Sequence, residues 1–590
     1  MTESHPGLGA LADALLSRVE DGRERDAWSW MLSRMQAYPN GKLVPAMKPP
    51  TRSERARRLV VFNLAVSGSV MDGTPAPVSL SWTAGPLPQR VKLGDAKTDA
   101  ATVAQAMFTH TNRGALLVFP DGAAQSFAIL LRHYARTWLR QGFTIEPLTA
   151  GATLRGLIVR KAKHSWALCD LGIMSGLEGI EEDAFCRSFA ISAPKSSAPV
   201  SRLHAALSDW QALSLEHFDA AASVTVGKAS IRAASRHLGQ RQWLWRAHPL
   251  AVTMLRDGGG YRGGYAAAQR YHGQAYRLDM NKAYTWALGE PMPSRLGFTR
   301  VARYDALQPG VFLCRVEGSG LAPLYLGVWY ENPRGFERVL WHGGDALAVL
   351  TSTEVGAIRR LGYRVTMGSG LTYLSTFTLR GFVAQVEGIT NIYGRGSPQE
   401  RIARAYGVSV YGKLAERPER MQVMYSLDSP GENWRAFVDE TGEEIADLWT
   451  AKTVAHRPHQ HVDAASEITS LVRSRLYDAI GAVRRAGGEV PHADTDGFLS
   501  SIDATALLDS HPTRPGAWRA AEGPQRAIVW GSKGYAFGED VRAAGFRGVT
   551  AAQAERALAG EATSVEMKER GAPFGDAPLY HPLRRQVRAV

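Results

Sequence analysis

The sequence contains only three cysteines in 590 residues, and their positions have neither zinc-ligand spacing nor the density of a disulfide framework. This scarcity is typical of a protein that works in a reducing interior. No run of eighteen apolar residues occurs, which argues against a membrane-spanning helix. The first residues also lack the basic-then-apolar pattern of a secretory signal. The sequence therefore predicts a folded cytoplasmic protein without a membrane partner.

The composition, with 45% hydrophobic and 21% charged residues, is that of an ordinary folded protein. The length exceeds what one hydrophobic core supports and predicts three or four domains. Lysine and arginine number 69 against 56 acidic residues, which gives a formal net charge of +13. Such an excess indicates a polyanionic partner, most simply nucleic acid, although many basic proteins bind none.

Two carboxylates separated by one residue, Asp494 and Asp496, interrupt the otherwise apolar stretch 490–499. They would share one face of a continuous strand, but the local Asp-Thr-Asp-Gly composition suits the tip of a hairpin equally well. Like charges this close favour a bound cation, and Mg²⁺ prefers such hard oxygen ligands. An isolated pair of this kind is more often a polar surface turn, so its interpretation depends on the rest of the chain.

Hydrophobic patterning divides the chain into regions of different type. Strands alternate with helices from residue 58 to about 240, which predicts an α/β domain. A glycine cluster at 258–264 marks a boundary. Farther on, 376–414 is mainly helical but broken at 394–398, and 464–486 is a strongly amphipathic helix that leads to the two carboxylates.

Five short motifs follow one another between residues 261 and 535. In chain order they are Tyr261-Arg262-Gly263-Gly264, Asp279-Met280-Asn281-Lys282-Ala283-Tyr284, the segment from Arg404 through Ser409 and Tyr411 to Gly412, His492-Ala493-Asp494-Thr495-Asp496-Gly497, and Lys533-Gly534-Tyr535. Their order and content resemble Y-x-G-G, D-x-x-S-L-Y-P, K-x-x-x-N-S-x-Y-G, Y-x-D-T-D-S and K-x-Y of the family B DNA polymerases. The resemblance is closest to the small protein-primed type of phages and linear plasmids.

The resemblance implies a mixed α/β and α+β multidomain protein, with a ribonuclease-H-like exonuclease fold followed by the palm, fingers and thumb of a right-hand polymerase. Two insertions lie where protein-primed members carry terminal-protein regions 1 and 2. The expected divisions are a helical extension (1–55), an exonuclease-like domain (56–240), a first palm segment (241–300), a first insertion (301–375), fingers (376–415), a second insertion (416–460), a second palm segment (461–545) and a thumb (546–590).

Nucleotidyl transfer in this family uses two metal ions, which stabilise the attacking and leaving oxygens. The resemblance implies that Asp279 and Asp496 are the principal ligands of two Mg²⁺ ions, with Mn²⁺ as an alternative. Asp494 would be a third ligand or would orient the others. The implied partners are primer-template DNA, deoxynucleoside triphosphates and, if initiation is protein-primed, a terminal protein.

The nucleotide site is expected around Tyr284, which would lie under the sugar and exclude a 2′-hydroxyl. Arg404 stands where the family has lysine, so it keeps the charge for the triphosphate but presents a planar fork. Tyr411 would flank the nascent base pair, Gly412 would allow close backbone approach, and Ser409 belongs to the same motif. DNA contacts are expected from Tyr261, Gly263, Gly264, Lys533 and Tyr535.

Several positions depart from the family pattern without removing a metal ligand. An apolar Val408 replaces Asn and cannot make its hydrogen bonds, so nucleotide affinity and fidelity are where we expect differences. The other departures are Lys282 for Ser, Thr285 for Pro, His492 for Tyr and Gly497 for Ser.

The exonuclease-like half lacks acids that proofreading needs. Asn63 and Ala65 stand in place of the Asp and Glu of the first motif. Asp121 begins the second motif, in which Ser126 takes the place of the acid, and Asp219 is the acid retained in the third. An amide and a methyl group cannot hold Mg²⁺ as carboxylates do. We therefore expect an inactive exonuclease fold.

The sequence thus predicts a template-directed DNA polymerase that lacks its own proofreading and replicates a phage or mobile element, in the host cytoplasm if it is phage-encoded. The alternative is a catalytically impaired polymerase fold that acts as a structural DNA-binding component. A nuclease is disfavoured because the surviving acids lie in the synthetic half.

Overall fold

The computed structural model describes most of the chain between residues 54 and 558 and four short strand segments after it. The described ranges are 54–67, 76–84, 87–94, 96–120, 124–150, 153–177, 182–189, 198–238, 249–294, 298–301, 309–332, 335–342, 346–438, 444–454, 457, 459–531, 533–543, 549–558, 563–566, 570–571, 580–581 and 584–587. The expected helical extension lies outside them except for its last two residues. Within these ranges, no helix is both long and apolar enough to cross a membrane.

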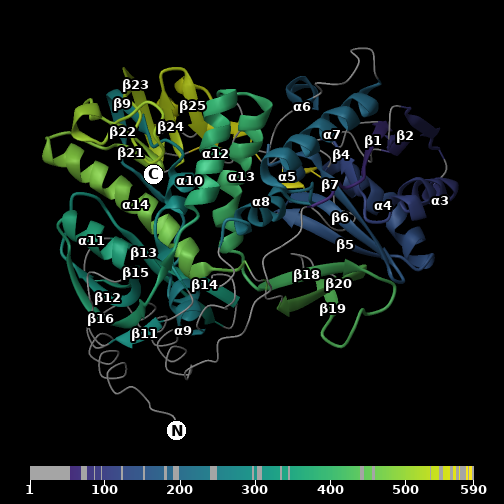
Figure 1. Ribbon diagram of the computed structural model, residues 1–590, viewed down its shortest axis with the longest axis horizontal. Helices are drawn as coiled ribbons and strands as arrows, with labels where there is room; N and C mark the ends of the chain where they lie inside the picture. Colours follow the sequence, from purple (N-terminus) through teal and green to yellow (C-terminus); the bar gives the residue numbers. More distant parts are fainter. Residues whose placement is uncertain are drawn as a thin grey trace, which may run out of the picture.

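The N-terminal half is built on a ten-stranded sheet, seen at the right of Figure 1. Strand β1 (Leu59–Ser67), third from one edge of this sheet, pairs in parallel with β4 (Leu116–Phe119). Because side chains alternate along a strand, Val60 and Phe62 pack on the α3–α4 side, while Leu59 and Val61 pack on the α7 side. The remaining elements here are β2 (Ala76–Thr83), β3 (Gln89–Lys92), α3 (Ala96–Met107), α4 (Ala124–Arg140), β5 (Thr144–Ala150), β6 (Thr153–Lys161), β7 (His164–Asp170), α5 (Leu171–Ser175), α6 (Glu182–Phe189), α7 (Pro199–Phe218) and α8 (Val226–Ser235).

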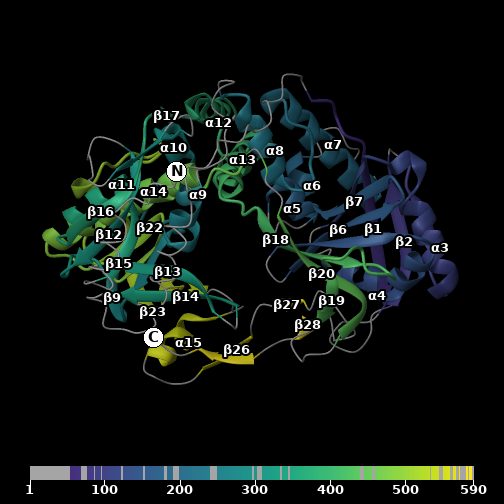
Figure 2. The same cartoon turned by 90° about the horizontal axis from the view of Figure 1, so that it is seen from below.

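Three strands from far along the chain extend this sheet. They are β18 (Glu419–Tyr425), β19 (Arg435–Val438) and β20 (Glu444–Val454). The connection is one pairing, between Tyr425 of β18 and Ile145 of β5. The polar stretch expected as the second insertion thus adds to the edge of the N-terminal sheet (Figure 2).

A second sheet of seven strands carries Asp279, Asp494 and the turn with Asp496. Its order is β25-β24-β23-β9-β22-β21-β8, so strands from residues 265–279 and 492–543 interleave. The long helix α14 (Val462–Arg485) confirms the amphipathic helix expected at 464–486. The strands are β8 (Tyr265–Ala268), β9 (Tyr271–Asp279), β21 (His492–Thr495), β22 (Gly497–Ser500), β23 (Glu522–Gly531), β24 (Gly534–Phe537) and β25 (Asp540–Ala543).

Two helices, α12 (Arg380–Tyr393) and α13 (Pro398–Leu414), lie between the two sheets (Figure 1). Between them Gly394 and Gly396 adopt φ values of +79° and +86°, which glycine reaches without strain. Ser397 then caps α13, accepting a hydrogen bond from the Glu400 backbone, with Pro398 at the first helical position. The predicted helix–break–helix pattern is confirmed.

The segment 298–373 forms a smaller unit, which we call the α11 subdomain. Its four-stranded sheet has the order β11-β16-β12-β15. The hairpin β13–β14 is a separate two-stranded sheet that contacts β15. Helix α11 packs against α14. The bounds are β11 (Phe298–Val301), β12 (Gly310–Glu317), β13 (Tyr325–Asn332), β14 (Gly335–His342), β15 (Ala346–Thr351), α11 (Ser352–Arg360) and β16 (Arg364–Tyr373).

The described C-terminal elements begin with α15 (Ala551–Leu558), which packs against β23. The strand pairs β26–β29 and β27–β28 follow, and β27 contacts β6 of the ten-stranded sheet. Figure 2 shows the elements β26 to β28 between the two halves of the molecule. Their bounds are β26 (Thr563–Glu566), β27 (Arg570–Gly571), β28 (Tyr580–His581) and β29 (Arg584–Val587).

Candidate active site

The two carboxylates of the 490–499 stretch lie at the tip of a hairpin. Asp494 pairs with Gly497, which leaves Thr495 and Asp496 as a two-residue turn. Thr495 has φ +64°, the left-handed conformation that such turns use. Its hydroxyl donates to Oδ1 of Asp494 over 2.9 Å, and the Asp496 N–H donates to the Asp494 carbonyl over 2.8 Å. The hairpin interpretation is confirmed and a continuous strand is excluded.

Asp279 reaches the same place from the neighbouring strand. It ends β9 and lies directly across from Gly497 of β22. The Met280 N–H donates to the Asp496 carbonyl over 2.8 Å, which fixes the end of β9 against the turn. A Cβ atom at Gly497 would collide with Oδ1 of Asp279, so the absence of a side chain there makes room for the carboxylate.

The three acids differ in their charged partners. Asp279 forms an ion pair with Arg519 over 2.8 Å, and Asp494 forms one with Lys533. No ion pair to Asp496 occurs among the described side chains. Burial, followed by the negative charges of Asp279 and then Asp494, raises the pKa of Asp496 to about 6. Asp496 is therefore the carboxylate whose charge is least compensated.

This donor set fits a divalent cation. Asp279 and Asp496 offer hard, anionic oxygens on adjacent strand ends, and a cation between them would remove the repulsion that raises the pKa of Asp496. As oriented, however, the side chains of the described residues form no group of three or more His, Cys, Asp or Glu positioned to hold a metal. Arg519 and Lys533 hold two of the acids instead.

Two tyrosines lie beside the acids. The rings of Tyr284, on α10 (Ala283–Gly289), and Tyr411, on α13, stack with centroids 4.2 Å apart and planes 12° apart. Burial raises the pKa of both, and the charge of Asp496 contributes to each shift. The next residue on α13, Gly412, faces open space, since a Cβ atom there would have nothing within 4 Å. The structure thus brings Tyr284 and Tyr411 together near Asp496, and their roles at a nucleotide stay predictions.

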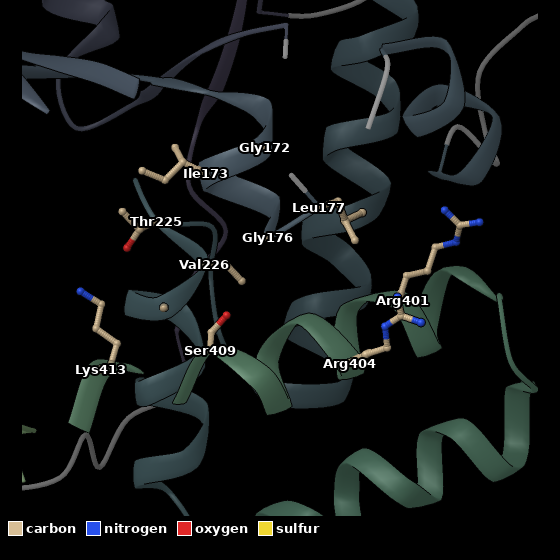
Figure 3. A pocket seen from close by; sticks show the side chains of 11 residues that line it. Gly172, Ile173, Gly176, Leu177, Thr225, Val226, Arg401, Arg404, Ser409 and Lys413 are labelled. Atoms are coloured by element: carbon tan, nitrogen blue, oxygen red, sulfur yellow. The ribbon is translucent and has the colours of Figure 1, made fainter. Parts of the chain in front are cut away.

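Arg404 and Ser409 lie elsewhere on α13. Both line a cavity of about 700 Å³ between α13 and the elements α5 and α8 of the N-terminal half (Figure 3). The Ser409 hydroxyl donates to the Ala405 carbonyl over 2.7 Å, a bond within the helix. Lys413 lines the same cavity, so this side of α13 is basic.

The two outer motifs frame the hairpin. Gly264 leads into β8, which pairs with β21, and a Cβ atom there would lie 2.6 Å from Oγ1 of Thr495. On the other side, Tyr535 of β24 packs its ring against His492 with centroids 4.5 Å apart. Tyr261 is half-buried, whereas a side chain at Gly263 would meet nothing within 4 Å.

Sequence reasoning missed Arg519. Its side chain pairs with Asp279, and its backbone N–H donates to the Asp279 carbonyl over 2.9 Å. Arg519 belongs to none of the five motifs, and its loop reaches β9 through the isolated bridge between Met280 and Trp518. No local pattern in the sequence signals that contact.

In the N-terminal half, Asn63 and Ala65 lie on β1, half-buried and exposed respectively. Ser126 is in the first turn of α4, and Asp121 lies outside the described residues. Neither Asn63 nor Ala65 can contribute a carboxylate, and the inactive exonuclease site stays a prediction.

Asp219 requires a correction. It caps the C-terminal end of α7 and accepts a hydrogen bond from the Glu54 backbone over 2.9 Å. The backbone N–H of Arg57 donates to Gln211, farther back along the helix, so the chain runs from Asp219 toward the other end of α7 as it enters β1. Asn63 lies nine residues beyond Glu54, farther along the chain in the direction away from Asp219. Asp219 therefore does not share a site with Asn63 and Ala65.

No protein-family model and no curated protein matches the sequence. Among solved structures the fold is that of a multidomain DNA polymerase, with an exonuclease-like domain followed by palm, fingers and thumb. Structures of Phi29 DNA polymerase are among the similar ones. Its ternary complex with primer-template DNA and incoming nucleotides superposes with a TM-score of 0.64 at 14% identity, covering 90% of this chain and 100% of that chain. Its binary complex with primer-template DNA gives 0.63 at 13% identity, with the same coverage. At this identity the likeness concerns the fold.

Proposed function

We propose that the protein is a template-directed DNA polymerase that adds deoxynucleotides to a primer 3′-hydroxyl. The observation that supports this most is the register of the seven-stranded palm sheet, in which Asp279 lies opposite Gly497 beside the turn that holds Asp496. Asp279 and the hairpin with Asp494 and Asp496 come from distant sequence positions and lie side by side there, in a fold similar to that of Phi29 DNA polymerase.

In this proposal Asp279 and Asp496 hold two divalent ions, Mg²⁺ or Mn²⁺. When bound, such ions stabilise negative charge on the attacking and leaving oxygens. Asp494, which is bound by Lys533 and Thr495, orients the hairpin. Lys533 would exchange this contact for the primer strand when DNA is bound.

Nucleotide selection would fall to the stacked tyrosines. Tyr284 lies against the sugar and Tyr411 against the nascent base pair, with Gly412 leaving space for it. Arg404 and Ser409 bind phosphate from the neighbouring side of α13. Tyr261, Gly263, Gly264 and Tyr535 contact DNA.

We further propose that the enzyme belongs to the protein-primed type of family B and replicates a phage or mobile element in the host cytoplasm. The α11 subdomain and the strands β18–β20 would correspond to the two terminal-protein regions, and a terminal protein would be their partner. The exonuclease-like domain would be inactive, because Asn63 and Ala65 supply no carboxylates.

A second candidate is a structural DNA-binding component without catalysis. The ion pairs of Asp279 with Arg519 and of Asp494 with Lys533 favour it, since they occupy oxygens that metal ions would need. Catalysis requires these two pairs to open when metal and substrate bind.

Primer extension separates the two candidates. The protein is incubated with Mg²⁺, a primer-template duplex and each deoxynucleotide singly, for each of the four template bases. A polymerase incorporates only the complementary nucleotide, and Asp496→Ala abolishes incorporation. A wild-type protein that binds the duplex but extends no primer would support the structural role. Incorporation that persists in Asp496→Ala would mean that the site is elsewhere.

A further inference from the structure

A fully buried carboxylate outside the active site lies between two arginines of the palm. Glu354 is in the first turn of α11, where it forms a capping box with Thr351. Its two oxygens accept hydrogen bonds from Nη2 of Arg262, each over 2.7 Å. Its Oε1 also accepts from Nε of Arg473, on α14, over 3.0 Å. The α11 subdomain thus contributes the central charge of a group whose other members belong to the palm.

Both arginines are satisfied by further hydrogen bonds. Arg262 donates to the carbonyls of Gly259 and Val349 over 3.0 and 3.1 Å. Arg473 donates to the carbonyls of Arg262 and Gly263, the latter over 2.6 Å. These further hydrogen bonds matter because a buried charge without partners is strongly destabilising.

Glu354 is ionised in this setting. Burial alone would raise the pKa of its carboxyl group, but the positive charges of Arg262 and Arg473 outweigh burial and lower that pKa. Removing the carboxylate would leave two guanidinium groups facing each other in the interior, so both would be expected to shift.

The group continues into the catalytic hairpin. The Gly263 carbonyl held by Arg473 immediately precedes Gly264, whose backbone packs on Thr495 in the turn between the carboxylates. The chain then enters β8, where Tyr265 pairs with Thr495 and Ala266 with Asp494. A shift of Arg473 would therefore move the strand that supports the hairpin.

We propose that Glu354 is a positioning residue for the palm carboxylates, acting through Arg262, Arg473 and Gly264 on the turn that holds Asp496. This rests on the proposed polymerase function. It gives the α11 subdomain a role in positioning the active centre, in addition to any contact it makes with other macromolecules.

The test compares Glu354→Gln with wild type. Glutamine keeps the shape and one acceptor but loses the charge that holds two arginines. We expect kcat for nucleotide addition to fall about 10- to 100-fold, as for other residues that orient ligands, while the KM for the nucleotide changes less than about threefold. The Mg²⁺ concentration for half-maximal activity rises. Calorimetry without nucleotide or DNA shows weaker Mn²⁺ binding.

Asp478→Asn is the matched control. Asp478 accepts two hydrogen bonds from Arg360, over 2.8 and 2.9 Å, and this pair also joins α11 to α14, but at the surface. If Glu354 only docked the two helices, both variants would lower thermal stability and neither would alter metal binding. We expect Asp478→Asn to keep the wild-type Mn²⁺ affinity.

A second variant keeps the proposal testable if Glu354→Gln does not fold. Arg473→Lys keeps a positive charge but cannot reach Glu354 and both carbonyls at once, and we expect the same loss of Mn²⁺ affinity. Wild-type Mn²⁺ affinity in folded Glu354→Gln or, if that variant does not fold, in Arg473→Lys would overturn the proposal. A wild-type protein that binds Mn²⁺ but adds no nucleotide would overturn the proposed polymerase function. The positioning role of Glu354 would then be judged from the Mn²⁺ affinities of the variants alone.

Discussion

Gly497 and Asp279 face each other across two neighbouring strands of the palm sheet, and the missing side chain of Gly497 leaves the space that the Asp279 carboxylate occupies. In this structure the glycine and the aspartate are therefore a matched pair.

This pairing predicts the effect of filling the space. Gly497→Ala should displace the Asp279 carboxylate and lower the rate of nucleotide addition about 10- to 100-fold, since a ligand would be moved without being removed. Single-turnover incorporation measures this. Gly388→Ala, on α12, is the control for an added methyl group, because a Cβ atom there meets no protein atom within 4 Å and Gly388 belongs to none of the proposed sites. Equal activity of Gly497→Ala and wild type would show that Asp279 can adopt another productive orientation.

The uncompensated charge of Asp496 predicts a stability effect. Its folded-state pKa of about 6 lies above the unfolded value, so the folded protein loses stability as pH rises from about 4 to 6. At pH 7 without metal, Asp496→Asn should therefore stabilise the protein by about 1 kcal/mol after screening. Thermal unfolding should show a higher midpoint for the variant, and Mg²⁺ should raise the midpoint of wild type only.

Asp494→Asn provides the comparison for that measurement. Asp494 already has Lys533 as a partner on a partly exposed surface, so removing its charge should bring no stabilisation. If Asp494→Asn raised the midpoint of thermal unfolding as much as Asp496→Asn, the stabilisation would be a general effect of net charge.

Sugar discrimination should depend on the ring of Tyr284. Tyr284→Val opens space beside Tyr411 and should reduce the preference for deoxynucleotides over ribonucleotides by about 100-fold. Tyr284→Phe keeps the stacked ring and should keep the preference. The measurement is the ratio of kcat/KM for the two sugars. Loss of the preference in the phenylalanine variant would assign it to the hydroxyl group.

The exonuclease-like domain should release no nucleotides from the 3′ end of a mismatched primer in Mg²⁺. Asn63 and Ala65 place an amide and a methyl group on β1 where carboxylates would be needed. The assay follows shortening of a labelled primer without nucleotides. Release that disappears in Asn63→Ala or in Ser126→Ala would contradict the prediction.

Local patterns in the sequence were sufficient for the parts of the fold that depend on neighbouring residues. The break between α12 and α13 and the amphipathic α14 follow from glycine, proline and periodicity within short windows. The grouping of Asp279 with Asp496 followed from motif order. The resemblance supplied it, because the physical cause is pairing between strands far apart in sequence.

Contacts over long sequence distances were not predictable. One pairing, between Tyr425 and Ile145, attaches β18–β20 to the N-terminal sheet, and a single pairing has no sequence signature. The ion pair of Arg519 with Asp279 and the position of Glu354 between two arginines also have no signature in the sequence. Asp219 was misassigned because a four-residue spacing cannot reveal which end of α7 faces Asn63.

The most direct test of the account is single-turnover incorporation of one complementary deoxynucleotide by wild type, Asp279→Asn and, as a control, Asp503→Asn. Asp503 caps the nearby Thr505 backbone and lies outside the site. The account predicts a loss of several kcal/mol of transition-state stabilisation, about 10³-fold or more in rate, for Asp279→Asn alone. A wild-type protein without incorporation, or an Asp279→Asn variant as fast as wild type, would contradict it.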